Sequence, residues 1–345
     1  MGAPMGAPMG ADPGLCQDCY GGGSPYGGDC YGGACGGWTH RYFAFGEYLY
    51  LRPRNAEVAY AVPVDNTLLV DNTSPLVQLG AVARVDPDYS NGFRIGFGSI
   101  LSERSSVVFT YAQLDSDEFD TISLPGTDDA VLRSLISNPN PIAPDADGLD
   151  AAAILQTQFQ LFDADYKGLY TCDPSLQVAW IVGARYGCLE QNLAAGFAAA
   201  TTEEVLARSK FEGGGIKLGL DVQRFGSNNE FFLYGKGSTS FLAGAFRTSY
   251  IVNDVDGAVI DNIANTSFSS GRIVTMLDLE TGIGWRNFND NLRLSVGYMF
   301  SNWFNVVKVN DFINAAQENN FVNTADNFNG RIGFDGLTAR IELLW

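Results

Sequence analysis

Apolar and polar side chains alternate along the last seventeen residues of the chain, from Asn329 to Trp345. From position 337 onward one face of an extended strand would carry Leu337, Ala339, Ile341, Leu343 and Trp345. Successive strand side chains point to opposite sides, so a period of two gives one apolar and one polar face. A final aromatic residue suits the rim of a membrane barrel, where aromatic side chains form a girdle. The same pattern also fits a half-buried strand of a soluble sheet, so other features must decide.

The same alternation recurs in five earlier segments, at 93–97, 178–186, 216–223, 273–286 and 292–300. Each carries large apolar residues on one face and charged residues or Gly on the other. A slip of one residue would move Arg185 or Arg340 into hydrocarbon, at a cost of roughly 2–4 kcal/mol near the midplane. We therefore expect the apolar faces to meet lipid and the polar faces to line a lumen, where Gly relieves crowding.

The links between strand-like segments alternate strictly between short and long. Strands are expected at 42–52, 89–101, 104–115, 158–171, 175–191, 210–225, 230–246, 271–288, 291–307 and 329–345. Turn-forming residues fill the short links, at 102–103, 172–174, 226–229 and 289–290. The long links are 53–88, 116–157, 192–209, 247–270 and 308–328. Short turns at one end and long loops at the other are typical of outer-membrane barrels.

The sequence therefore predicts an all-β fold. It is an antiparallel transmembrane β-barrel of about ten strands, within a range of roughly 8–12, with short periplasmic turns and long external loops. An unpaired backbone group in lipid costs several kcal/mol, so the first strand, Tyr42–Arg52, should pair with the last, Asn329–Trp345.

Composition agrees with this fold class. No run approaches the ~20 consecutive apolar residues that a membrane helix needs, whereas barrel strands distribute their apolar residues by alternation. The chain holds 40 Gly, 23 Phe and 15 Tyr against one His, which favours an aromatic-rich all-β protein.

The formal charge of −18 excludes nucleic acid as a partner, because its phosphates would be repelled. The acidic residues cluster at 115–120, 128–129, 145–150 and 254–256, which we interpret as loops. Asp115, Asp117, Glu118 and Asp120 offer oxygen ligands for calcium, but their spacing is not that of an EF-hand. Solvated loop charge is the better interpretation, and no metal site or cofactor is expected.

The N-terminal segment 1–39 is rich in Gly, Cys and Tyr and is expected to be flexible, while residues 40–345 form the outer-membrane barrel. It lacks the cationic start and continuous apolar core of a signal peptide, so the export signal is expected upstream or already removed. Cys16 and Cys19 have one half of a zinc-knuckle spacing without a second close pair. Disulfides, within the segment or to a neighbour, are the preferred interpretation for its four cysteines. Cys172 and Cys188 lie too far apart along one hairpin to bridge and are expected as free thiols.

Three segments resemble the Legionella-type pore-forming outer membrane proteins, a family also abundant in planctomycetes. They are the aromatic opening strand from Tyr42 to Pro53, the strand W-I-V-G-A-R-Y from Trp180 to Tyr186, and the ending from Phe334 to Glu342. The resemblance covers about His40 to Trp345. It implies an outer-membrane pore in the cell outer membrane and supplies no catalytic residues.

The first functional hypothesis is passive diffusion of small polar solutes or ions through a charged lumen. The candidate lumen residues are Arg94, Lys167, Arg185, Lys217, Asp221, Asp278, Glu280, Arg286, Arg293, Arg340 and Glu342. The alternative is a plugged structural or adhesive barrel without conductance, because clear channels come with ~16 strands and about ten can be filled by side chains.

An enzyme is not expected. Hydrolytic chemistry in such barrels calls for a His base beside a carboxylate or Ser, and the only His is His40 at the edge of the first strand. The expected partners are outer-membrane lipid, small solutes or ions, and the barrel-assembly machinery, which would engage the C-terminal strand ending at Trp345.

Overall fold

A computed structural model describes residues 40–65, 77–102, 104–124, 130–137, 150–173, 175–198, 202–226, 230–256, 259–319 and 328–345. The predictions for segment 1–39 and its four cysteines lie outside these residues. So do Asp128, Asp129, positions 145–149, and the turn positions 103, 174 and 227–229.

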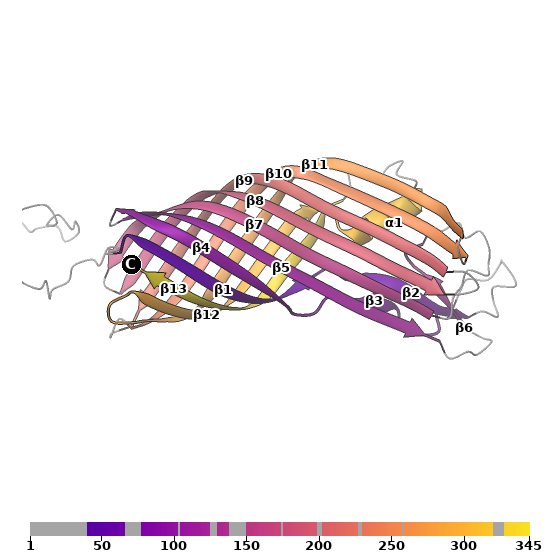
Figure 1. Cartoon of the computed structure of the whole chain (residues 1–345), viewed down its shortest axis with the longest axis horizontal. Coiled ribbons are helices and arrows are strands. Elements are labelled where there is room, and N and C mark those ends of the chain that lie inside the picture. Colours follow the sequence, from indigo (N-terminus) through magenta and orange to yellow (C-terminus); the bar gives the residue numbers. More distant parts are fainter. Residues whose placement is uncertain are drawn as a thin grey trace, which may run out of the picture. The chain divides into compact units, whose positions relative to one another are not determined.

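Ten antiparallel strands close into a barrel (Figure 1). They are β1 (Tyr42–Arg54), β4 (Ser90–Ser102), β5 (Ser105–Ser123), β7 (Asp150–Asp173), β8 (Leu176–Ala198), β9 (Thr202–Phe225), β10 (Phe231–Asp256), β11 (Val259–Arg286), β12 (Leu292–Val306) and β13 (Gly330–Leu344). The ring closes where β1 pairs with β13, from Phe43 opposite Leu344 to Arg54 opposite Gly333. The expected strand number and the expected pairing of first and last strands are both confirmed.

The two faces of the wall follow the predicted alternation. On the outside, Ile216 and Ile283 are 59% and 64% exposed, whereas Glu47 and Arg185 on the inside are 3% and 6% exposed. Glycine makes room inside the ring, because a Cβ atom at Gly96 would come within 2.3 Å of the Phe45 ring. The outer apolar band is the surface that meets lipid, and the polar side chains turn inward.

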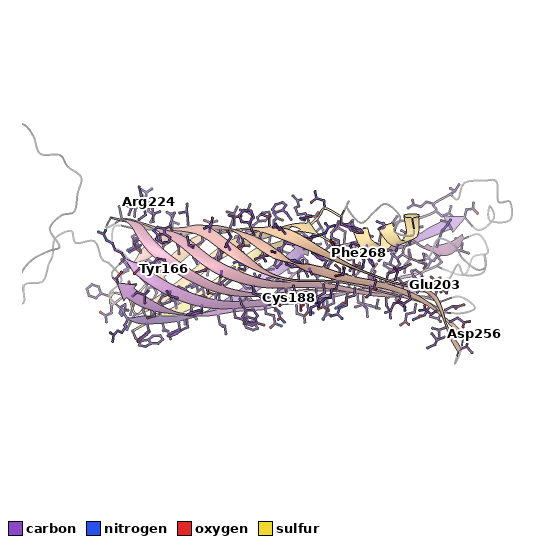
Figure 2. The ribbon with its side chains drawn as sticks, turned by 90° about the horizontal axis from the view of Figure 1, so that it is seen from above. Tyr166, Cys188, Glu203, Arg224, Asp256 and Phe268 are labelled. Carbon is purple, nitrogen blue, oxygen red and sulfur yellow. The ribbon has the colours of Figure 1, made fainter. Side chains whose placement is uncertain are left out.

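Six strands, β5 and β7 to β11, extend far beyond their predicted ends. β7 to β11 run for 23 to 28 residues each and continue well past the apolar band. Figure 2 shows Cys188 about midway along this wall, with Glu203 and Asp256 towards its far end. The predicted loops at 116–157, 192–209 and 247–270 are therefore wrong for most of their described residues, which form strand. The acidic residues from Asp115 to Asp120 likewise belong to β5 instead of a loop.

The strand extensions were missed because the apolar residues change faces. In β9, Ile216, Leu218 and Leu220 point outward, but Phe211 and Val205, nearer the long-loop end, are buried inside. The apolar positions thus shift from even to odd residue numbers. The alternation of outward apolar residues therefore ends at this point, although the backbone continues as strand.

An inner plug fills the barrel at its long-loop end. It consists of the sheet β3-β2-β6, with β2 (Val58–Asp65), β3 (Ala83–Val85) and β6 (Ala130–Ser134), together with helix α1 (Val309–Asn319). These elements occupy the predicted long links 53–88, 116–157 and 308–328. The sequence around α1 repeats Val309, Phe312, Ile313 and Ala316 at helical spacing, which gives it one apolar face. Within the described residues, no helix is long and apolar enough to cross a membrane.

The main hydrophobic core lies between the plug and the strand extensions. Phe312 and Ile313 of α1 and Tyr60 of β2 are fully buried in one cluster with Phe211 and Phe246 of the wall. The long-loop half of the interior is therefore apolar, whereas the sequence predicted a polar lumen throughout. The inward face of the extensions is packed against protein, so no water is available to favour polar residues there.

Candidate functional site

The lumen contains three levels along the barrel, beginning with an apolar layer next to the plug. Phe159 of β7, Trp303 of β12 and Phe334 of β13 are at most 2% exposed. The Phe159 and Phe334 rings meet edge to face at 4.8 Å, and Phe159 and Trp303 lie 6.4 Å apart between ring centroids. Gly187 leaves room for this layer, since a Cβ there would sit 3.0 Å from Leu242 and 3.3 Å from Trp303.

Polar contacts fix the plug to the inner wall above this layer. The Ser209 hydroxyl donates to the Val307 carbonyl at 2.6 Å, just before α1. The first amide of α1, at Val309, donates to Gln191 Oε1 at 3.3 Å. On the side of the small sheet, the Tyr250 hydroxyl donates to the Ile136 carbonyl at 2.7 Å. Burial of these groups with their partners satisfied makes the plug an integral part of the fold.

The second level is an ionic layer of buried charged side chains from seven strands of the ring. Arg185 forms a fork on Asp163, with Nε and one terminal nitrogen at 2.7 and 2.8 Å from the two carboxylate oxygens, and its other nitrogen reaches Asp278. Lys217 Nζ lies 2.7 Å from both Asp163 and Asp165. Such pairing offsets the cost of removing these charges from water.

A second branch of the ionic layer connects β1, β4, β10 and β11. Arg94 Nη1 lies 3.1 Å from Glu47 and 3.0 Å from Glu280. Lys236 Nζ approaches Glu280 at 3.5 Å. A cavity of about 110 Å³ lies in this layer and is bounded by Arg94, Arg185 and Lys217 among others.

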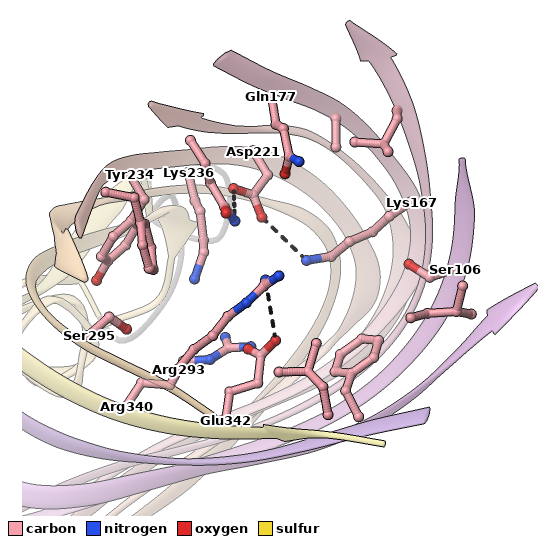
Figure 3. A pocket seen from close by; sticks show the side chains of 17 residues that line it. Ser106, Lys167, Gln177, Asp221, Tyr234, Lys236, Arg293, Ser295, Arg340 and Glu342 are labelled. Carbon is pink, nitrogen blue, oxygen red and sulfur yellow. Dashed lines mark hydrogen bonds and ion pairs between the residues drawn. The ribbon is translucent and has the colours of Figure 1, made fainter. Parts of the chain in front are cut away.

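The third level is the turn-side chamber, a cavity of about 80 Å³ at the short-turn end of the strands. Figure 3 shows Lys167, Lys236, Arg293 and Arg340 converging on it from four strands. Two carboxylates share the wall: Asp221 lies 3.5 Å from Lys167 Nζ, and Glu342 is paired with Arg340 and lies 3.9 Å from Arg293.

The structure places ten of the eleven candidate lumen residues in these two polar levels. The ionic layer holds Arg94, Arg185, Lys217, Asp278 and Glu280, and the chamber holds Lys167, Asp221, Arg293, Arg340 and Glu342. Arg286 lies apart, with its guanidinium 4.2 Å from the centroid of the Phe225 ring and an ion pair to Asp290.

Four charged residues of the lumen were missed by sequence reasoning, namely Glu47, Asp163, Asp165 and Lys236. A signal was present for the aspartates, because Asp163 and Asp165 alternate with Phe162, Ala164 and Tyr166. The inward face of β7 is therefore polar in this segment, and the same alternation of apolar and polar residues identified Arg185 in β8.

No group of His, Cys, Asp and Glu within the described residues is arranged to hold a metal ion. The candidate calcium ligands are divided by the strand: Asp115 and Asp117 lie on one face of β5, and Glu118 and Asp120 on the other. Asp120 instead accepts a hydrogen bond from the Tyr60 hydroxyl at 3.0 Å. Cys188 is a free thiol. In the β7–β8 register it lies opposite Gln160, which is twelve positions along β7 from Cys172, so the backbone positions of the two cysteines are far apart.

Several solved structures match most of this chain at low sequence identity. The outer membrane protease OmpT from Escherichia coli has 12% identity over 88% of this chain and 97% of its own, with a TM-score of 0.47. The CymD monoaromatic hydrocarbon channel has 9% identity over 89% and 88%, with a TM-score of 0.29. LpxR from Salmonella typhimurium has 10% identity over 88% and 100%, with a TM-score of 0.25. A search of curated proteins gave no match.

The family comparison covers nearly the whole barrel. The profile described as the Legionella pneumophila major outer membrane protein precursor matches residues 39–343. This span includes the ten strands of the ring, apart from Leu344 at the end of β13, and the plug between them. The chain therefore belongs to the Legionella major outer membrane protein family and is a β-barrel of the outer membrane.

Proposed function

We propose that this protein is a plugged outer-membrane barrel with a structural or surface-presenting role, whose lumen does not conduct in the folded state. The observation that carries the proposal is the apolar layer of Phe159, Trp303 and Phe334 across the lumen, each side chain at most 2% exposed. A ring of about ten strands has an interior that side chains can fill. Ions and polar solutes would lose their hydration in such a layer without gaining a partner.

The packing on both sides of the apolar layer supports the same conclusion. Towards the long-loop end, the plug buries Phe312 and Ile313 against the wall. Towards the turns, Arg185 and Lys217 are held by three carboxylates in the ionic layer. The wall beyond the lipid band, formed by the extensions of β7 to β11, is then the surface that the protein presents outside the membrane.

Passive diffusion of small polar solutes or ions is the second candidate. It is favoured by the two polar cavities, of about 110 and 80 Å³, and by the mixed charges that line them. In this case the plug and the apolar layer would have to move aside during conduction. We propose no catalytic role, since the chain's one histidine, His40, precedes β1 and has no hydrogen-bond partner for its Nε2 among the described residues.

Planar-bilayer recording of the detergent-folded protein separates the two candidates. The wild-type protein should give no conductance steps, whereas the double variant Phe159→Ala with Trp303→Ala should give them, because it removes two of the three rings of the apolar layer. The matched control is Phe162→Ala, which truncates a neighbouring β7 side chain on the outer wall, 49% exposed. Regular steps from the wild-type protein, unchanged in the double variant, would establish the pore and overturn the plugged barrel.

A further inference from the structure

We propose that the turn-side chamber is a binding site for a small oxyanion of the phosphate class. This inference rests on the side chains that line the chamber and is independent of whether the lumen conducts. Among the described residues of its wall, Lys167, Lys236, Arg293 and Arg340 are cationic and only Asp221 and Glu342 are carboxylates. Two further carboxylates stand behind the wall: Asp290 holds the Arg293 guanidinium at 2.6 and 2.8 Å, and Glu280 lies 3.5 Å from Lys236 Nζ. The least tightly paired cations of the wall are therefore its two lysines.

The two ammonium groups of the chamber are incompletely neutralised by the protein, whereas Arg293 is paired with Asp290 and Arg340 with Glu342. The two lysines have weak pairs, with Lys167 Nζ 3.5 Å from Asp221 and Lys236 Nζ 3.5 Å from Glu280. By contrast, Lys217 in the ionic layer has two carboxylates at 2.7 Å. A strong charge-assisted bond is about 2.7–2.9 Å long, so both chamber lysines retain donor capacity.

The lysines are also placed to reach a ligand from solution. Their side chains are 20% and 22% exposed, and Figure 3 shows both amino groups pointing into the space between the strands. Arg293 enters the same space from β12, and the Tyr234 and Ser295 side chains add hydroxyl groups to the wall. An oxyanion in this position would accept hydrogen bonds from ammonium and guanidinium groups together, and the low-dielectric wall would strengthen them.

The size and chemistry of the chamber select this ligand class. A volume of about 80 Å³ corresponds to roughly five to eight water-sized positions, which accommodates a tetrahedral oxyanion with part of its hydration shell. The cationic side chains that face the cavity donate hydrogen bonds and offer no lone pairs to a metal cation. The short-turn end is the periplasmic end in barrels of this type, so the ligand would come from the periplasm.

Isothermal titration calorimetry with inorganic phosphate on the full detergent-folded chain tests the proposal. Ionic strength is held constant with sodium chloride. Lys236→Gln should weaken phosphate binding about tenfold or more, because one charge-assisted bond is lost. Asp221→Asn should tighten binding, because it removes a competing negative charge. Lys210→Gln, on the outer wall and paired with Glu212, is the matched control and should leave the affinity unchanged.

The opposite directions of the two chamber variants keep the test decisive. Heat-modifiable gel migration reports folding of each variant, and if Lys236→Gln does not fold, tighter binding by Asp221→Asn still supports the site. Four results would each overturn the proposal. They are absence of phosphate binding to the wild type, an equal response to chloride alone, equal affinity in folded Lys236→Gln, and weaker binding by Asp221→Asn.

Discussion

Tyr42 and Trp345 join the two ends of the barrel through a pair of backbone hydrogen bonds. The Tyr42 amide donates to the Trp345 carbonyl, and the Trp345 amide donates to the Tyr42 carbonyl, each at 2.9 Å. The Trp345 ring lies 6.5 Å from the rings of both Tyr42 and Phe97, measured between centroids. The last residue of the chain therefore completes the ladder and an aromatic cluster on its outer surface.

Trp345→Ala should reduce assembly in cells more than refolding in detergent. The backbone bonds survive this substitution, and the lost ring contacts are each worth only about 0.5–1.5 kcal/mol. Recognition by the barrel-assembly machinery, which we propose to use this residue, would be lost. The measurement compares the heat-modifiable fraction in isolated membranes with that after refolding, using Trp285→Ala as the control, which removes a tryptophan of β11 away from the β1–β13 seam. Equal losses in both settings would argue against a role of Trp345 in recognition.

Gly336→Ala should prevent proper closure of the β1–β13 seam. A Cβ at this position would lie 2.0 Å from the Tyr50 carbonyl oxygen and 3.0 Å from Leu51 Cα, both backbone atoms of the adjacent strand. Overpacking typically costs about 1–3 kcal/mol, and a backbone neighbour has little freedom to move away. Gly46→Ala in the same seam is the control, because a Cβ there meets nothing within 4 Å. Guanidinium unfolding midpoints should fall for Gly336→Ala alone, and a similar fall for both would remove the steric explanation.

Arg185→Ala should destabilise the barrel by about 3–5 kcal/mol, because it leaves Asp163 and Asp278 buried without their main partner. The Arg185 side chain is 5% exposed. Arg247→Ala provides the contrast, since its ion pair with Glu212 is on the surface and its side chain is 73% exposed. The change there should be within about 0.5 kcal/mol. Unfolding midpoints measure both, and comparable effects would mean that the ionic layer is hydrated.

Asp311 should make the unfolding free energy depend on pH in the acidic range just above the ordinary pKa of an aspartate. Burial raises the pKa of this α1 carboxyl above its ordinary value of 3.8, although Lys308 at 3.7 Å acts in the opposite direction. Between the ordinary and the raised pKa, the folded state binds the proton more readily than the unfolded state, so stability falls as pH rises through that window. Asp311→Asn should abolish this slope. Melting temperatures of both proteins across the window provide the measurement, and parallel curves would contradict the assignment.

The membrane-spanning half of the fold was predictable because lipid imposes a strict pattern. Ile216, Leu218 and Leu220 must alternate with residues that avoid hydrocarbon, so the pattern identified both the strand and the inward side of Lys217 and Asp221. The same argument identified the pairing of Tyr42–Arg52 with the last strand, since a barrel in lipid leaves no edge unpaired.

The plug and its contacts could not be predicted in the same way. The Tyr250–Ile136 and Gln191–Val309 hydrogen bonds join residues more than a hundred positions apart. They arise from the shape of the enclosed space, which local periodicity does not encode. The same holds for the pairing of Arg94 with Glu280, since each residue signals its inward direction but not its partner.

The exchange of apolar residues between the two wall faces also determines how deeply the molecule is immersed. Below the exchange the outer surface of β9 carries Ile216 and Leu218, and above it Glu212 and Arg208. If the barrel moved deeper into the membrane by two residues of strand, ionised side chains would enter the hydrocarbon. If it moved outward by the same amount, isoleucine and leucine would be exposed to water. Both displacements are unfavourable. The point in each strand at which the outward residues change from apolar to charged therefore fixes the height of the protein relative to the lipid surface.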